Sequence, residues 1–101
     1  MKTPKIITFY TEKGSIIIAL CGGIDGVYFD ISCPFVAVYD RSGDIELSPL
    51  PGFCLVPDKS IVMSRSSICM WGETEPTEAA LYKAELAIIL SNRDRKNRRA
   101  G

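Results

Sequence analysis

Apolar and polar residues alternate along much of the first two thirds of the chain. The alternation is clearest over residues 27–33, where the odd-numbered positions are apolar and the even-numbered ones are more polar. A period of two is the spacing of side chains on one face of a β-strand. Similar short runs recur between turn-forming residues. The pattern predicts strands over residues 5–11, 15–21, 27–33, 35–39, 45–48, 53–56, 61–64 and 67–71.

The segments between these runs favour turns. Residues 40–44 read Asp-Arg-Ser-Gly-Asp, in which Asp and Gly adopt turn conformations at little steric cost, so a hairpin is expected there. The Gly-rich segment 22–26 is expected to be a wide turn that joins two strands. Short strands joined by such turns are typical of an antiparallel meander that curls into a small barrel.

The periodicity changes after Gly72. Thr74, Glu75 and Pro76 supply an N-cap hydroxyl, a first-turn carboxylate and a first-turn proline, which together open a helix. Beyond them an apolar stripe follows at helical spacing. The stripe comprises Leu81, Ala84 and Ile88, flanked by Ala80 and Ala87, and predicts a helix over about 75–92 that packs this face on the sheet.

These elements make one domain of the α+β class, mainly β. We expect an antiparallel β-meander or small barrel of six to eight short strands, followed by one C-terminal α-helix. The domain covers residues 1–92, and residues 93–101 form a basic, flexible tail. A single domain fits the length of 101 residues, and 47% hydrophobic residues are enough to build a core.

The chain contains no histidine. This excludes Ser-His-Asp and Cys-His nucleophile systems, histidine-ligated zinc or haem, and imidazole acid–base catalysis. The four cysteines show no C-x₂₋₄-C spacing and lie in or beside apolar segments, so we expect reduced, buried cysteines. No metal and no cofactor is expected. The longest apolar run, residues 16–21, is far too short to cross a bilayer, which predicts a cytoplasmic protein without a membrane contact.

The chain has 12 basic and 12 acidic residues, but the two signs are unevenly distributed along it. Residues 1–92 hold 7 basic and 11 acidic side chains, a net charge of −4, and the tail restores +4. The tail is therefore a candidate contact for nucleic acid or an acidic partner, although a solvated tail that complements the helix dipole is the simpler interpretation. Its cations are Arg93, Arg95, Lys96, Arg98 and Arg99.

Acidic residues also cluster over residues 25–46. Neighbouring strands of a meander could bring several of them onto one face that binds a basic partner surface, whereas a solvated face with turn aspartates is the simpler interpretation. The candidate acidic face comprises Asp25, Asp30, Asp40, Asp44 and Glu46. Three aromatic residues, Tyr28, Trp71 and Tyr82, are candidate interface anchors, because buried aromatics dominate binding energetics.

The favoured functional hypothesis is a small non-enzymatic interaction protein that binds another protein and modulates or inhibits it. An accessory protein of a phage or mobile element would have this character. The alternative is a nucleic-acid-binding protein that uses the basic tail. A small carboxylate-based nuclease or toxin-like ribonuclease ranks third. Uncovered strand edges or the helix could also support a homodimer.

Overall fold

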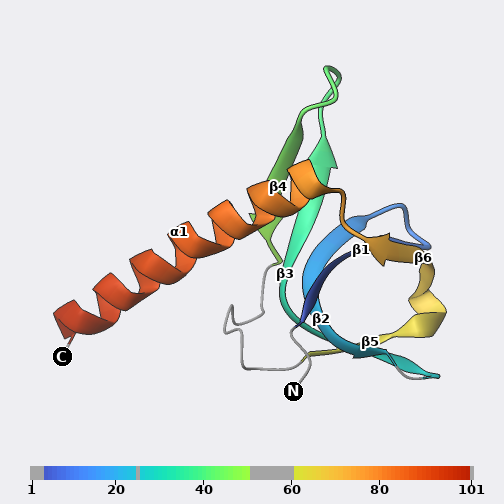
Figure 1. Ribbon diagram of the computed structural model, residues 1–101, viewed down its shortest axis with the longest axis horizontal. Helices are drawn as coiled ribbons and strands as arrows, with labels where there is room; N and C mark the ends of the chain where they lie inside the picture. The colour runs from blue at the N-terminus through green and yellow to red at the C-terminus, as the bar shows by residue number, and fades with distance from the viewer. Residues whose placement is uncertain (1–3, 25, 51–60, 101) are drawn as a thin grey trace.

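The computed structural model describes residues 4–24, 26–50 and 61–100, and over 93–100 it describes the course of the backbone (Figure 1). These described residues form six strands, one short 3₁₀ helix and one α-helix. The elements are β1 (Lys5–Thr11), β2 (Ile16–Ile24), β3 (Tyr28–Tyr39), β4 (Ile45–Pro49), β5 (Ile61–Ser64), η1 (Arg65–Ser67), β6 (Ile68–Glu73) and α1 (Pro76–Ala100). The expected strand over 53–56 and Asp25 lie outside the described residues.

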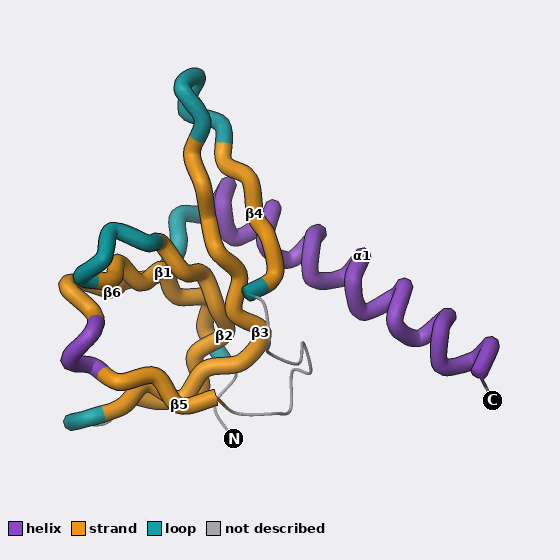
Figure 2. Tube along the Cα trace, turned by 180° about the vertical axis from the view of Figure 1, so that it is seen from behind, coloured by secondary structure: helices purple, strands orange, loops and turns teal. Residues whose placement is uncertain are grey.

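All strand pairings are antiparallel, and the sheet follows the order β4-β3-β2-β1-β6. The first four strands form a meander, as the alternation predicted. β5 pairs with the first part of β3, and β6 returns to the far edge of β1. Figures 1 and 2 show the sheet curling round, with η1 joining β5 to β6. Since the described β5 and β6 do not pair with each other, the sheet is curled but not closed.

β3 is one long strand with an irregularity near its middle. Ile18 pairs with Phe35 and Leu20 with Ser32, so β3 has one more residue than β2 across this interval. Cys33 lies in this interval with a φ of 50°, a left-handed conformation that is uncommon outside glycine and typical of a β-bulge. An extra residue reverses the alternation of side chains. The two strands expected over 27–33 and 35–39 are therefore one strand whose inward-facing positions change at the bulge.

The bulge separates two apolar clusters. Before it, Phe29 and Ile31 face the inside of the curl; after it, Phe35 and Ala37 face α1. The first cluster also contains Ile7, Phe9, Ala19, Cys21 and Ile68, and the second contains Ile18, Cys33, Tyr82 and Leu86. One strand thus contributes to both the core inside the curled sheet and the core between sheet and helix.

The helix packs on the sheet through a different face from the one expected. Tyr82 and Leu86 are buried, whereas Ala84 and Ile88 of the expected stripe are exposed. The expectation was wrong because α1 has apolar residues on two faces. The face with Tyr82 has the larger apolar side chains. In addition, the Tyr82 hydroxyl donates a hydrogen bond to a backbone carbonyl of the sheet.

Tyr82 joins the helix to the bulge. Its side chain is fully buried, its hydroxyl donates a hydrogen bond of 2.7 Å to the carbonyl oxygen of Cys33, and its ring meets Phe35 edge-on at 5.3 Å. Burial raises the pKa of the Tyr82 hydroxyl above its ordinary value. Tyr82 was expected to be an interface anchor; in the structure it is a core residue with no surface for a partner.

The helix also ends later than expected, at Ala100 instead of near Asn92. Residues 93–100 contain no glycine or proline, and Arg and Lys are favourable helix formers. Cations near a helix C-terminus also complement its dipole. The segment expected to be a tail is therefore a continuation of α1. Within the described part of the chain, no helix has both the length and the apolar character needed to traverse a lipid bilayer.

The variant Tyr82→Phe should destabilise the fold by about 1–3 kcal/mol, because it leaves the buried Cys33 carbonyl without this donor. Urea unfolding followed by circular dichroism measures the effect. Tyr10→Phe is the matched control, since it removes a hydroxyl from a tyrosine that is 40% exposed. Equal stability of Tyr82→Phe and the wild type would contradict the role assigned to this bond.

Candidate functional site

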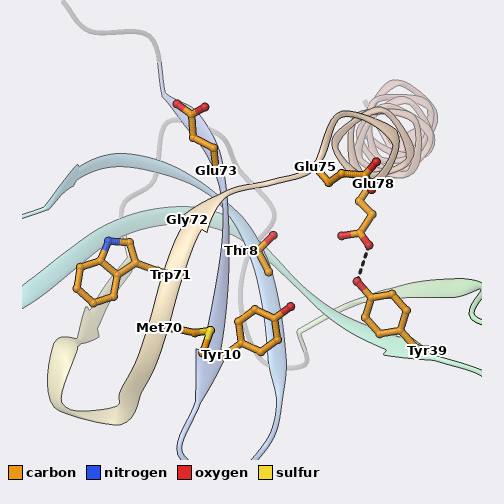
Figure 3. Close-up of a pocket in the computed structure, with 9 residues that line it drawn as sticks. All are labelled: Thr8, Tyr10, Tyr39, Met70, Trp71, Gly72, Glu73, Glu75 and Glu78. Atoms are coloured by element: carbon orange, nitrogen blue, oxygen red, sulfur yellow. Dashed lines mark hydrogen bonds between the residues drawn. The ribbon is translucent and has the colours of Figure 1, made fainter.

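A hollow of about 370 Å³ lies where β1 and β6 meet the start of α1 (Figure 3). This volume falls within the range of ligand-binding pockets in proteins. We call it the acid-aromatic hollow, because aromatic rings and carboxylates dominate its lining. The lining residues are Thr8, Tyr10, Tyr39, Met70, Trp71, Gly72, Glu73, Glu75 and Glu78.

Pairing of β1 with β6 forms the floor of the acid-aromatic hollow. Tyr10 pairs with Met70 and Thr8 with Gly72, so these residues stand side by side on two strands (Figure 3). Gly72 has no side chain, which leaves space above Thr8. The Thr8 hydroxyl is hydrogen bonded to that of Thr74 at 2.8 Å, which holds the segment between β6 and α1 against β1.

The start of α1 contributes two carboxylates, Glu78 in its first turn and Glu75 immediately before it. The Tyr39 hydroxyl, at the end of β3, donates a hydrogen bond of 2.6 Å to Oε1 of Glu78 (Figure 3). This bond to the charged carboxylate raises the pKa of Tyr39 to about 12. The positive end of the helix dipole stabilises negative charge at these two positions. The bond therefore links the hairpin formed by β3 and β4 to the helix start.

Trp71 stands at the border of the acid-aromatic hollow and also covers the core. Its ring meets Phe29 edge-on at 4.9 Å, and the Arg65 guanidinium lies over it at 4.9 Å from the ring centre. The Trp71 residue remains 38% exposed. It can therefore contact a ligand without leaving its place against Phe29. Tyr28, the other exposed candidate anchor, pairs with Ser64 on β5 and is not part of the hollow.

Every charged residue that lines the acid-aromatic hollow is a glutamate. Glu73 forms an ion pair of 3.0 Å with Lys5, but both side chains are 71% exposed, and such surface pairs contribute little. Glu75 and Glu78 have no such pair in the described residues. Across the described residues, no three acidic or cysteine side chains are grouped closely enough to hold a metal ion. The hollow therefore offers negative charge beside aromatic surface.

The expected acidic face is distributed over separate parts of the molecule. Asp30 lies in the first part of β3 opposite Val62, and Glu46 lies on β4 opposite Val38. Asp40 and Asp44 are at the tip of the hairpin between β3 and β4, roughly 30 Å of strand from Asp30 (Figure 1).

The tip aspartates have a structural role in the turn. Asp40 Oδ1 accepts hydrogen bonds from the backbone N–H groups of Ser42 and Asp44, at 2.9 and 3.0 Å, and from the Ser42 hydroxyl at 2.6 Å. The bond from Ser42 is the main reason that the pKa of Asp40 lies below its ordinary value. Gly43 supplies the positive φ of 91° that the turn needs.

The basic residues expected to contact nucleic acid belong to the last part of α1. The helix spans 25 residues, or about 37 Å, and begins at the acid-aromatic hollow. The C-terminal end of α1 is therefore far from its start, as Figures 1 and 2 both show.

The cysteines divide between core and surface. Cys21 and Cys33 are buried, in agreement with the expectation, and burial raises the pKa of the Cys21 thiol. Cys69 is free but exposed on β6, so the expectation was wrong for this residue. Cys54 lies outside the described residues.

Sequence reasoning missed most of the acid-aromatic hollow. Glu75 was recognised only as a helix-opening residue, and Tyr10 and Tyr39 were not among the candidate site residues. Their association depends on the pairing of β1 with β6, two strands at opposite ends of the β region. The one local signal was the density of carboxylates around the helix start, at Glu73, Glu75 and Glu78.

The chain matches no protein-family model, and no curated protein matches it in sequence. Function is therefore inferred from the chemistry of the acid-aromatic hollow.

Ionisation of Tyr39 offers a direct check on the geometry of the acid-aromatic hollow. Its pKa near 12 should fall toward the ordinary 10.0 in Glu78→Gln, because the neutral amide no longer disfavours the tyrosinate. A pH titration of the ring carbon that bears the hydroxyl, followed by NMR with labelled tyrosine, measures each tyrosine separately.

The raised pKa of Tyr39 also makes its contribution to the free energy of unfolding depend on pH. Its folded pKa lies above its unfolded pKa, so its contribution is complete below pH 10 and is lost as the pH rises toward 12. Because Tyr39 is partly exposed, solvent screening makes this contribution small. An unchanged Tyr39 titration in Glu78→Gln would contradict the hydrogen bond.

Proposed function

We propose that this chain is a small non-enzymatic interaction protein that binds a positively charged, extended segment of another protein in the acid-aromatic hollow. By occupying that segment, it modulates or blocks the partner. One observation carries the proposal: three glutamates line the hollow beside three aromatic rings and a methionine, with no lysine or arginine among the lining residues.

The chemistry of the lining suits lysine and arginine side chains. Tyr10 and Tyr39 are about 40% exposed and offer ring faces to a cation, while Met70 is exposed and adapts its shape to apolar stems. Glu75 and Glu78 supply carboxylates for the charged ends. Such a surface matches a peptide bearing alternating cationic and apolar groups better than a small neutral ligand.

The charge of the body supports the same partner. Residues 1–92 carry a net charge of −4, with 7 basic and 11 acidic side chains. The negative charge of this part of the molecule increases the rate at which a cationic segment encounters its surface, and salt weakens this effect. Binding should therefore weaken as salt concentration rises.

A titration with synthetic peptides tests the proposal. The probe is an Arg-Pro repeat peptide, with a Glu-Pro repeat of the same length as its counterpart, added to the ¹⁵N-labelled full chain. We expect NMR shifts at the backbone amides of Thr8, Tyr10, Gly72, Glu75 and Glu78 with the basic peptide only. The double variant Glu75→Gln with Glu78→Gln should weaken binding about threefold to tenfold, since two partly exposed ion pairs are lost.

A second double variant separates local charge from total charge. Asp30→Asn with Glu46→Gln removes the same number of negative charges away from the acid-aromatic hollow, and it should leave binding nearly unchanged. If both double variants weakened peptide binding equally, total charge and not the position of Glu75 and Glu78 would explain the binding. Shifts centred elsewhere, or equal shifts with the acidic peptide, would refute the proposed site.

A further inference from the structure

β6 is an edge strand: in the part of the chain that the structure describes, it pairs with β1 on one side and with no strand on the other. We call the second side the open edge. The N–H of Thr74 donates a hydrogen bond of 3.0 Å to the carbonyl oxygen of Ile6 on β1. Backbone groups of successive residues in a strand point to alternate sides. The N–H and C=O groups of Glu73 and Trp71 therefore point toward the open edge.

The exposure of β6 agrees with an open edge. A strand with one face on a core normally shows buried and exposed residues in alternation, whereas residues 69–73 are all exposed. Gly72 carries no side chain, and apart from its chain neighbours no atom lies within 4 Å of the place that a Cβ would take. A glycine within a strand often marks close approach of another backbone. A further strand can thus pair with β6 without displacing a side chain.

Trp71 borders two hollows, one on each face of β6. The acid-aromatic hollow lies on the face that carries Met70, and Figure 3 shows Trp71 and Met70 on opposite sides of the strand. A second hollow, of about 500 Å³, shares only Trp71 with the first. Its other lining residues are Gly26, Val27, Ser64, Arg65, Ser66 and Ile68. The open edge therefore runs between two recesses.

The two hollows differ in charge. Three glutamates and no cation line the acid-aromatic hollow. The second hollow contains the Arg65 guanidinium, which lies over the Trp71 ring, and among the described residues its lining has no carboxylate. Val27 in this lining is 59% exposed and offers apolar surface. A cationic side chain is therefore favoured on the first face of β6, and an apolar side chain is favoured on the second.

We infer that the extended segment of the partner adds to the open edge of β6 as a further strand of the sheet. This inference rests on the proposed function and extends it from side chains to the backbone. Side chains of a strand alternate between its two faces, so every second residue would face the acid-aromatic hollow and the residues between would face Val27 and Trp71. The occupant is therefore a segment in which basic and apolar residues alternate. Backbone hydrogen bonds to Trp71 and Glu73 supply affinity, and the two hollows select the sequence.

N-methylated peptides test the strand pairing. The probe is a peptide of alternating arginine and valine with the length of β6, six residues, added to the ¹⁵N-labelled full chain. One derivative carries N-methyl groups on the arginines only, and the other carries them on the valines only. Both lose the same number of donors, but in an added strand only one set of N–H groups faces β6. With arginine side chains in the acid-aromatic hollow, that set is the valines in an antiparallel strand and the arginines in a parallel one.

The unmethylated peptide should shift the amide signals of Trp71 and Glu73. One methylated derivative should bind at least about tenfold more weakly than the other, and the weaker one reports the direction of the strand. Equal affinities of the two derivatives would overturn strand addition. The proposed function would still stand in that case if the unmethylated peptide shifted the amides of the acid-aromatic hollow. If no basic peptide shifted those amides, the proposed function would fail and this inference with it.

Glu73→Pro tests the same edge from the side of the protein. Proline removes the N–H that points to the open edge, and an edge strand accepts it. Glu73→Ala is the matched control, because both variants lose the ion pair with Lys5 and only the proline loses the N–H. The arginine-valine peptide should bind about threefold to tenfold more weakly to Glu73→Pro than to Glu73→Ala, with both variants keeping the wild-type circular dichroism spectrum. Equal binding to two folded variants would overturn the inference.

Discussion

The arrangement of helix and sheet depends on one buried hydrogen bond, from the Tyr82 hydroxyl to the carbonyl oxygen of Cys33. The acceptor belongs to the bulge at which β3 changes its inward-facing side chains. A left-handed non-glycine residue is unfavourable by itself and persists where its surroundings hold it. Tyr82 supplies part of that support and in return positions α1. The bulge, the second apolar cluster and the helix direction therefore form one coupled arrangement.

The acid-aromatic hollow is a consequence of that arrangement. Because Tyr82 anchors α1 within its second turn, the carboxylates at the start of the helix come to lie beside Tyr39 and β1. The hydroxyl groups of Thr8 and Thr74 hold the connection between β6 and α1 in the same place. Three separate parts of the chain thus meet at a surface that combines negative charge with exposed aromatic rings.

Local sequence patterns predicted the strands, turns and helix of this fold, but not how these elements pack and pair with one another. The period of two over residues 27–33, the hairpin at 40–44 and the helix opening at Thr74–Pro76 are visible in short windows, because each is encoded by neighbouring residues. The helix face could not be chosen, since α1 has two apolar faces and the deciding partner of Tyr82 is 49 residues away. The association of Tyr10 with Met70 likewise requires the register of two distant strands.

The return of β6 to β1 also has a consequence for how the chain folds. Thr8 and Thr74 are separated by 66 residues, so their contact requires the intervening meander to be in place. Contacts between distant parts of a chain form slowly compared with neighbouring hairpins, because loop closure is entropically unfavourable. β1 to β4 can assemble hairpin by hairpin, and β6 with α1 completes the sheet afterwards. We therefore expect the surface that carries the acid-aromatic hollow to form late in folding, so that ligand recognition requires the native protein.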